Sequence, residues 1–340
     1  MSTGVAIIGA GMVAHTHVSA LREIAGATIC GVYSRSLEGT RAFAGEYGLS
    51  VYERFEDVLT DPAVTAVIIC LPPGNHAEFC IAAAKAKKHV IVEKPMEITV
   101  ARSRQMIVAC RENGVSLSVI FQNRYTPAAC RVKQALEAGA LGRLLLADAY
   151  IKWYRSPAYY QSRNWRGTLA IEGGGALINQ AIHTIDLLQW LAGGVRSVSG
   201  LVRTTTHAIE AEDLGVAMVE FVNGALGVIE GSTAILPSYK ERIELHGEKG
   251  SIILEGGNIR EWKVAGMEET DYVAAEKASY GVTDSPAISH VNHQAQLTEI
   301  LAAIAHGRQP LVSGEEGLKA LEIITAIYHS SKTRQWVDLR

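Results

Sequence analysis

The first fourteen residues constrain the fold of this chain more than any other segment. Val5–Ile8 is an apolar run typical of a buried strand, and the pattern G-x-G-x-x-A follows at once over residues 9–14, before a helix-like stretch at 15–24. The two glycines permit a tight turn and a close approach of the backbone to a pyrophosphate, and the helix directs its first N–H groups at the phosphates. The alternative is an ordinary glycine-rich turn. We expect a dinucleotide-binding turn with cofactor contacts from Gly9, Gly11, Met12 and Val13.

Composition limits the class of protein. The chain has 340 residues, 48% of them hydrophobic, and a net charge of −3 at pH 7. This length suggests two domains, and the charge gives no reason to expect nucleic acid or an anionic membrane as a partner. No apolar run is long enough to span a bilayer, so we expect a cytoplasmic protein. The five cysteines form no C-x-x-C pair, and we expect them to be reduced, mostly buried thiols and not metal ligands.

The first third of the chain alternates strand-like and helix-like segments. Alternation at this spacing predicts right-handed crossovers and a doubly wound parallel sheet. Asn113-Gly114 is a typical helix stop. We expect strands at 5–8, 28–33, 66–70, 89–92 and 115–120, and helices at 15–24, 37–47, 75–86 and 99–112.

The rest of the chain has a different pattern. Consecutive strands without intervening helices predict an antiparallel sheet. The expected strands lie at 144–152, 196–204, 214–221, 225–231, 242–246, 251–255 and 259–263, and the expected helices at 128–137, 176–191, 288–306 and 315–329. We therefore expect two α/β domains, residues 1–122 with a Rossmann-type sheet and residues 123–340 with an open, mainly antiparallel sheet.

The end of the second strand bears on the choice of cofactor. It reads Tyr33-Ser34-Arg35-Ser36, without the carboxylate that NAD-specific folds place there for the ribose 2′-hydroxyl. Serine hydroxyls donate to phosphate oxygens, and Arg35 pairs with a 2′-phosphate or stacks on adenine. The alternative is an exposed turn without a function. We expect NADP as the preferred cofactor and NAD as the second choice, with Ser34 and Arg35 as contacts.

Glu93-Lys94-Pro95 follows the strand at 89–92. Ligands of α/β sheets bind at the carboxyl ends of the strands, so Lys94 lies where a substrate would react. A lysine there is suited to acid–base chemistry or to stabilising a developing alkoxide. The alternative is a surface lysine paired with Glu93.

A third motif begins at Glu172-Gly173-Gly174-Gly175 and continues into an apolar helix. On an α-helix, Asn179 and His183 share one face, and Asp186 lies on the same side, where it would orient the imidazole. Polar groups in so apolar a helix are costly unless they are satisfied or used. The alternative is a core histidine bonded to the backbone.

These three motifs resemble the Gfo/Idh/MocA family of glucose–fructose oxidoreductase and inositol dehydrogenase, and the resemblance covers essentially the whole chain. It implies NAD(P)-dependent oxidation or reduction of a sugar or cyclitol hydroxyl, and a C-terminal sheet that makes homodimer or homotetramer contacts. Lys94, His183 and Asn179 are the expected catalytic residues. Further cofactor contacts are expected from Leu71, Pro72, Asn75, His76, Glu93, Lys94 and Arg166. Expected substrate contacts are Lys94, Gln122, Arg124, Tyr154, Trp165, Asn179 and His183.

One residue departs from the family pattern. Many members carry Asp four residues before the helix histidine, where this chain has Asn179. An amide does not hold an imidazolium by charge, so we expect His183 to be less basic and Lys94 to be the principal acid–base group. Two other functions stay open: a redox-assisted glycosidase or eliminase that recycles a tightly held cofactor, and a non-catalytic NAD(P)-binding regulator.

Overall fold

The computed structural model describes residues 3–266 and 289–339. The chain divides into two compact units, each made of two segments. The first unit takes residues 1–122 and 286–318, and the second takes residues 123–285 and 319–340.

The first unit alternates strands and helices, as its sequence pattern predicts. Its strands are β1 (Thr3–Ile8), β2 (Ala27–Tyr33), β3 (Ala66–Ile69), β4 (His89–Val92) and β5 (Leu117–Val119). Its helices are α1 (Met12–Arg22), α2 (Leu37–Tyr47), α3 (Phe55–Thr60), η1 (Pro73–Asn75), α4 (His76–Lys85), α5 (Val100–Asn113) and α9 (Val291–Ala305). The short helix α3 has no counterpart in the sequence prediction, because six residues are too few to show a helical period.

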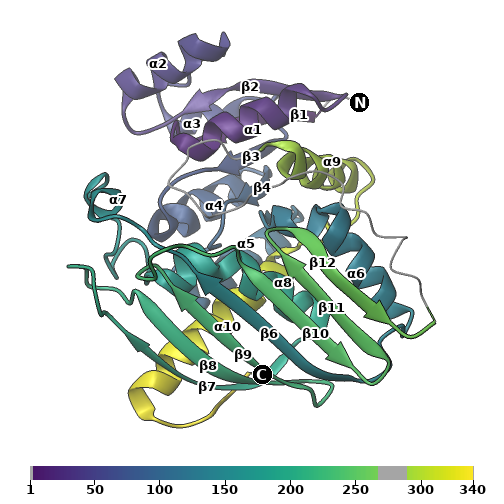
Figure 1. The fold of residues 1–340 in the computed structure, drawn as a ribbon. Coiled ribbons are helices and arrows are strands. Elements are labelled where there is room, and N and C mark those ends of the chain that lie inside the picture. The colour runs from purple at the N-terminus through teal and green to yellow at the C-terminus, as the bar shows by residue number, and fades with distance from the viewer. Residues whose placement is uncertain (1–2, 267–288, 340) are drawn as a thin grey trace. The chain divides into compact units, whose positions relative to one another are not determined.

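The five strands form one parallel sheet in the order β2-β1-β3-β4-β5 (Figure 1). Val5, Ile7, Ile68 and Ile91 belong to a core cluster with side chains of α1, α2 and α9. Helices α4 and α5 contact each other and pack on β3 to β5. Successive side chains of a strand point to opposite faces, so helices cover both faces and the sheet is doubly wound.

Helix α9 is grouped differently from the sequence-based boundary, which assigned everything after residue 122 to the second domain. Leu297, Ile300 and Leu301 of α9 are buried in the same cluster as Val18 and Leu21 of α1. Because this packing buries apolar surface, α9 belongs to the first unit and not to the second. Residue 288, the expected start of this helix, lies outside the described residues.

The second unit is built around a larger sheet. Its strands are β6 (Leu144–Lys152), β7 (Val195–Arg203), β8 (Leu214–Phe221), β9 (Leu226–Ser232), β10 (Arg242–Gly247), β11 (Gly250–Glu255), β12 (Asn258–Val264) and β13 (Val337–Asp338). Its helices are α6 (Pro127–Glu137), α7 (Pro157–Gln161), η3 (Ala176–Ala181) and α8 (Ile182–Ala192). Two further helices, η2 (Gln122–Tyr125) and α10 (Gly314–Thr333), span the division between the units.

Within the described residues, this sheet has eight strands in the order β12-β11-β10-β6-β9-β8-β7-β13. All neighbouring pairs are antiparallel except β6 and β9, which run parallel. The expected fold class, a Rossmann domain followed by a mainly antiparallel α/β domain, is confirmed.

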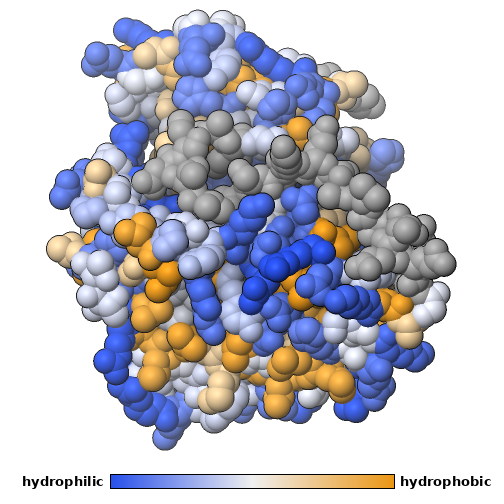
Figure 2. All heavy atoms as spheres, viewed as in Figure 1, coloured by the Kyte–Doolittle hydropathy of each residue, from blue (hydrophilic) through white to orange (hydrophobic). Residues whose placement is uncertain are grey.

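The large sheet has one covered and one open face. Ala147, Ala149 and Ile151 of β6 are fully buried, and α8 and α10 lie behind the sheet in Figure 1. Alternate residues point to the other face, where large apolar side chains are exposed, and Figure 2 shows apolar residues gathered over these strands. They are Leu146, Leu201, Val216, Met218 and Leu226.

The glycine-rich turn after β1 uses its two glycines differently. Gly9 has a φ of +114°, and a Cβ there would stand 2.6 Å from the carbonyl oxygen of Cys70. Gly11 precedes α1 with a φ of −88°, and a Cβ there would meet nothing within 4 Å. Gly9 therefore serves the fold, whereas Gly11 leaves open space for a ligand.

The two positions should separate stability from nucleotide affinity. We expect Gly9→Ala to lower the free energy of unfolding by about 1–3 kcal/mol, because a side chain is strained and crowded there. Gly11→Ala should cost less than about 1 kcal/mol but weaken NAD(P)H binding roughly tenfold or more, which corresponds to about 1.4 kcal/mol. Urea denaturation and titration calorimetry measure the two effects. Equal losses of stability in both variants would contradict this division.

Candidate functional site

The predicted site residues of the first unit gather at one edge of its parallel sheet. In register, Ile8 of β1 pairs with Ile69 of β3, and Ile69 pairs with Val92 of β4. The segments that leave these strands therefore start side by side. They are the turn at 9–13, the loop at 70–76 and Glu93-Lys94-Pro95.

The N-terminus of α1 is open to an anion. Gly11 is its N-cap and provides no side chain, and the first turn contains no acidic residue. Met12 is 56% exposed and Val13 is half-buried. The first N–H groups of a helix have no partners within the helix, and the helix dipole adds positive potential there. The turn thus has the donors and the space that a pyrophosphate requires.

The segment after β2 presents one exposed cation. The Ser34 hydroxyl bonds to the Thr40 hydroxyl at 2.6 Å and donates to the Ser36 carbonyl at 3.2 Å. The Ser36 hydroxyl accepts from the Gly39 N–H and so caps α2. The Arg35 side chain is exposed. The serines, which sequence analysis assigned to phosphate recognition, are thus largely committed to shaping the turn, and Arg35 carries the charge.

The loop after β3 holds His76 inside the protein. The His76 ring is fully buried, with Nε2 at 2.7 Å from the Leu71 carbonyl oxygen and Nδ1 at 3.1 Å from the Pro95 carbonyl oxygen. Its side chain is therefore out of reach of a ligand at the surface, contrary to the cofactor contact expected from the sequence. Instead it ties the loop to the segment after Lys94. Leu71, Pro72 and Asn75, in the same loop, are half-buried.

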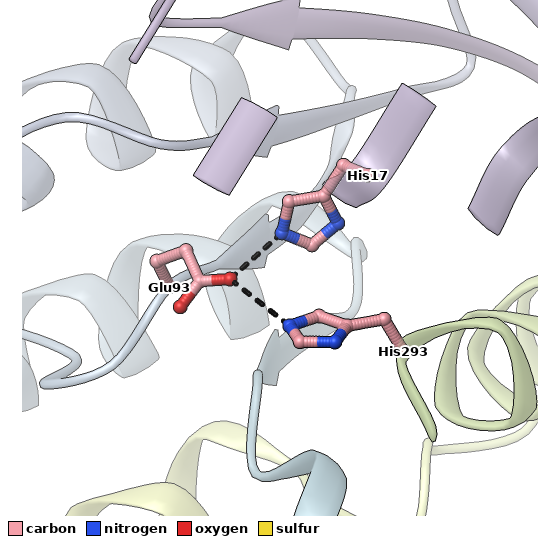
Figure 3. A group of neighbouring side chains, drawn as sticks. All are labelled: His17, Glu93 and His293. Carbon is pink, nitrogen blue, oxygen red and sulfur yellow. Dashed lines mark hydrogen bonds and ion pairs between the residues drawn. The ribbon is translucent and has the colours of Figure 1, made fainter. Parts of the chain in front are cut away.

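Glu93 and Lys94 leave the end of β4 in different directions. Lys94 is half-buried, and a cis peptide bond joins it to Pro95. Glu93 is 6% exposed, and its Oε1 accepts a 2.7 Å hydrogen bond from Nε2 of His17 on α1 (Figure 3). Nε2 of His293 on α9 lies 3.9 Å from the same oxygen. Glu93 is thus an internal group, and the alternative of a surface Glu93–Lys94 pair does not describe this carboxylate.

The pKa values of this cluster follow from burial and hydrogen bonding. Burial alone raises the pKa of Glu93, but the hydrogen bond and charge of His17 outweigh it and hold the pKa at about 2. Burial, with the charge of His17 acting in the same direction, lowers the pKa of His293 to about 4. At neutral pH, Glu93 is therefore ionised and His293 is neutral.

Neither His17 nor His293 is predicted as a site residue from the sequence. His17 occupies a fully buried position of α1 beside Val18 and Leu21, so a polar residue in an apolar helical stripe was the available signal. His293 reaches Glu93 only through the tertiary packing of α9, and no local pattern predicts that.

The remaining predicted site residues belong to the second unit, where the helix after the three glycines differs from the predicted form. Residues Ala176–Ala181 are π-helical, and the α-helix starts only at Ile182. Asn179 and His183 therefore do not share one regular α-helix. A π-helical turn commonly marks a functional site.

Two of the three glycines of this motif have packing roles. A Cβ at Gly174 would stand 2.2 Å from the Tyr328 hydroxyl, and one at Gly175 would stand 2.0 Å from the Glu212 carbonyl oxygen. The buried Glu212 carboxylate accepts from the N–H groups of Gly175 and Leu177 at 2.9 and 2.8 Å. This helix start is thus capped by the protein itself and is not an anion site.

Asn179 is held by a carboxylate that the sequence motif did not assign. The Glu172 side chain is 2% exposed and accepts hydrogen bonds from the Asn179 amide and from the Gly167 N–H. The acid that the family pattern places at position 179 is absent, but an acid contacts the amide that replaces it. The orientation of Asn179 is therefore fixed through its NH₂ group.

Two further expectations need correction. Asp186, expected to orient His183, forms a two-pronged ion pair with Arg124, with Nη2 and Nε at 2.6 and 2.8 Å from its oxygens. Arg124 is only 5% exposed, so this guanidinium supports the second unit and is not placed to bind a substrate. Gln122 is also buried. A close buried pair of this kind gives no sequence signal, because its members lie far apart in the chain.

The loop after β6 combines aromatic and basic side chains. The Arg166 guanidinium lies 3.9 Å from the centre of the Tyr159 ring and donates to the Tyr159 carbonyl at 2.9 Å. Gln180 of η3 donates to the Tyr159 hydroxyl at 2.9 Å. Trp165 and Tyr154 are half-buried. The loop is thus attached to the π-helix and carries polar groups and ring faces of the kind that bind polyols.

Two further findings concern composition. The five cysteines are free thiols; Cys70, Cys80 and Cys110 are buried, and Cys30 and Cys130 are half-buried. In the part of the chain that the structure describes, no helix is both long and apolar enough to cross a membrane.

Comparison with known proteins covers both units. Residues 3–121 match the model of an oxidoreductase family with an NAD-binding Rossmann fold, and residues 130–253 match the GFO/IDH/MocA C-terminal domain. The myo-inositol 2-dehydrogenase of Thermotoga maritima is 28% identical over 341 residues, which span 98% of each chain. The levoglucosan dehydrogenase of Pseudarthrobacter phenanthrenivorans is 28% identical over 340 residues, or 89% of this chain and 86% of that relative.

Solved structures of dehydrogenases are similar to this chain over its whole length. The WlbA dehydrogenase from Bordetella pertussis, in complex with NADH and UDP-GlcNAcA, is 30% identical and superposes with a TM-score of 0.90 over 100% of this chain and 99% of that one. The models of the N-terminal and C-terminal domains of one family match this chain in the expected order. This chain therefore belongs to the Gfo/Idh/MocA family and is an NAD-binding oxidoreductase.

Proposed function

We propose that the chain transfers a hydride between NAD(P) and a secondary hydroxyl or ketone of a sugar, a sugar derivative or a cyclitol. The observation that carries this proposal is the placement of Lys94. It follows β4 at the same sheet edge as the glycine turn, on a backbone held by the buried His76 and Glu93. A lysine whose main chain is held at the same sheet edge as a nucleotide-binding turn is suited to proton transfer at a carbon that exchanges hydride.

The first unit fits the dinucleotide. Gly11 leaves open space at the N-terminus of α1, and that helix has no side-chain cap. When bound, the nicotinamide ring accepts a hydride from the substrate carbon or returns one to it. Lys94 Nζ would take the hydroxyl proton during oxidation and return it during reduction. Asn179 and His183 would hydrogen-bond the substrate hydroxyls, and Tyr154 and Trp165 would bind the rest of the sugar.

The substrate class is testable with a panel of compounds named for the relatives: myo-inositol, levoglucosan, apiose and UDP-GlcNAcA. We expect at least one compound to reduce NAD or NADP, as measured by the absorbance of the reduced nicotinamide. Lys94→Met should lower kcat by about 10²–10⁴ with little change in cofactor affinity. Lys85→Met, which removes an exposed lysine at the end of α4, is the matched control and should leave kcat unchanged.

Two outcomes would contradict this function. Near-normal kcat in Lys94→Met would remove the lysine from the chemistry. Cleavage or elimination of a glycoside without added cofactor, and without net reduction of NAD(P), would favour the redox-assisted glycosidase alternative.

We propose further that Arg35 gives NADP an advantage over NAD. Its exposed guanidinium stands at the end of β2, where the adenosine ribose binds in this fold. The structurally similar WlbA dehydrogenase was solved with NADH, so the affinity of this protein has to be measured for both NADP(H) and NAD(H).

Arg35→Ala should abolish a preference for NADP(H) over NAD(H). One charge-assisted contact is worth about 1.5–3 kcal/mol, or roughly tenfold or more in affinity. Arg41→Ala removes an exposed arginine of α2 that pairs with Glu53 and should retain the preference. Titration calorimetry decides the question, and equal affinities of the unmutated protein for the two cofactors would end this proposal.

We also infer that the open face of the large sheet mediates assembly of a homodimer or homotetramer. Leu146, Val216, Met218 and Leu226 are each between 39% and 58% exposed there, and a contiguous apolar patch is typical of an interface. Met218→Glu should reduce the mass measured by light scattering at micromolar concentration, because a charge in the contact disfavours association. A monomeric mass for the unmutated protein would contradict assembly.

A further inference from the structure

Three buried side chains from three separate elements meet in the first unit, near the sheet edge from which Lys94 departs. His17 lies on α1, Glu93 follows β4, and His293 lies on α9 (Figure 3). Their exposed fractions are 0%, 6% and 2%. A buried charge is costly unless it is paired and hydrogen-bonded, so a cluster of this kind requires an explanation.

The Glu93 carboxylate connects two parts of the proposed site. Its Oε1 accepts from His17 Nε2 at 2.7 Å, and its Oε2 accepts from the Lys94 main-chain N–H at 3.2 Å. Because an ionised carboxylate only accepts, the proton of the first bond lies on Nε2 of His17. One carboxylate therefore joins the nucleotide-binding helix to the backbone of the reactive lysine.

The same three side chains have the composition of a metal site, and all their ligand atoms lie within 4.8 Å of one another. The distance between His17 and Glu93 indicates a direct hydrogen bond and not a shared metal ion. Ligand atoms at 2.0–2.1 Å from a tetrahedral zinc stand roughly 3.3 Å apart, whereas His17 and Glu93 are only 2.7 Å apart. Metal-bound histidines also donate from their second ring nitrogen, and Nδ1 of both His17 and His293 lacks a hydrogen-bond partner among the described residues.

We propose that His17 is a positioning residue for Lys94: it fixes the Glu93 carboxylate, which in turn fixes the main chain of Lys94 relative to the cofactor-binding helix. This proposal rests on the proposed function of Lys94. A displacement of about 1 Å between reacting groups can cost roughly 10²-fold in rate, so the effect is expected in kcat and not in cofactor affinity.

His17→Leu removes the Nε2–H donor and replaces the imidazole by an apolar side chain of comparable size. We expect kcat to fall roughly 10- to 100-fold, with KM and the Kd for NAD(P)H within about threefold. His17→Gln places an N–H near the position of Nε2 and should restore kcat to within about fivefold of the unmutated protein. His293→Leu is the matched control. It removes an equally buried imidazole that lies 3.9 Å from the same carboxylate oxygen, beyond hydrogen-bond distance, and it should change kcat less than threefold.

Hydrogen exchange provides a readout that does not depend on activity. The Lys94 amide is bonded to Glu93, so the peptide that spans residues 91–97 should exchange faster in His17→Leu than in His293→Leu. Equal exchange and equal kcat in these two variants would overturn the proposal. Stoichiometric zinc or another transition metal in the purified protein, measured by plasma mass spectrometry, would also overturn it.

A double-mutant cycle keeps the test decisive if His17→Leu fails to fold with an unbonded charge inside. Glu93→Gln removes that charge, and in this background His17→Leu should cost less than threefold in kcat, because the connection runs through the carboxylate. A full 10- to 100-fold loss in that background would refute it. Lys94→Met, assayed in parallel, separates the two proposals. A normal kcat in Lys94→Met refutes the function of Lys94. A reduced kcat in Lys94→Met together with a normal kcat in His17→Leu refutes only the positioning role of His17.

Discussion

The parallel register of β1, β3 and β4 is the constraint on which the first unit depends. All residues of β1 and β3, and three of the four in β4, are buried, so their main-chain groups must find partners within the sheet. The observed register leaves Gly9, Cys70 and Glu93 as neighbours just beyond the paired residues. The close approach of Gly9 to Cys70, and the departure of Lys94 from the same edge, are consequences of that alignment.

Much of this arrangement is predictable, because the signals are local. Gly114 ends α5 in the left-handed conformation at φ +68°, as the Asn113-Gly114 pair predicts, and Gly224 forms the turn between β8 and β9. Alternation of short apolar runs and helical stretches gave the parallel sheet, and the consecutive strands gave the second sheet. The glycine turn and the position of Lys94 after β4 followed from the same patterns. These features depend on the spacing of a few adjacent residues, which a single sequence displays.

The rest depends on contacts between distant residues. Arg124 is assigned to a substrate by its motif, but Asp186, in another element, takes up its guanidinium. The Asn179 amide is fixed by Glu172 across the π-helical turn, and a π-helix has no residue pattern that distinguishes it from an α-helix. His293 joins the first unit only because α9 buries Leu297 and Ile300 against α1. In each case the partner is selected by packing, which the local sequence does not encode.

The parallel pairing of β6 with β9 has a consequence for how this protein can diversify. Parallel neighbours cannot be joined by a tight turn, and the chain between them contains α7, the π-helical turn, α8, β7 and β8. The helix that carries His183 is therefore part of the connection that the sheet requires, whereas the aromatic loop at its beginning is anchored through side chains such as Arg166 and Gln180. Insertions in that loop would leave the order of the strands undisturbed, so the length and composition of this segment can change on an unchanged scaffold.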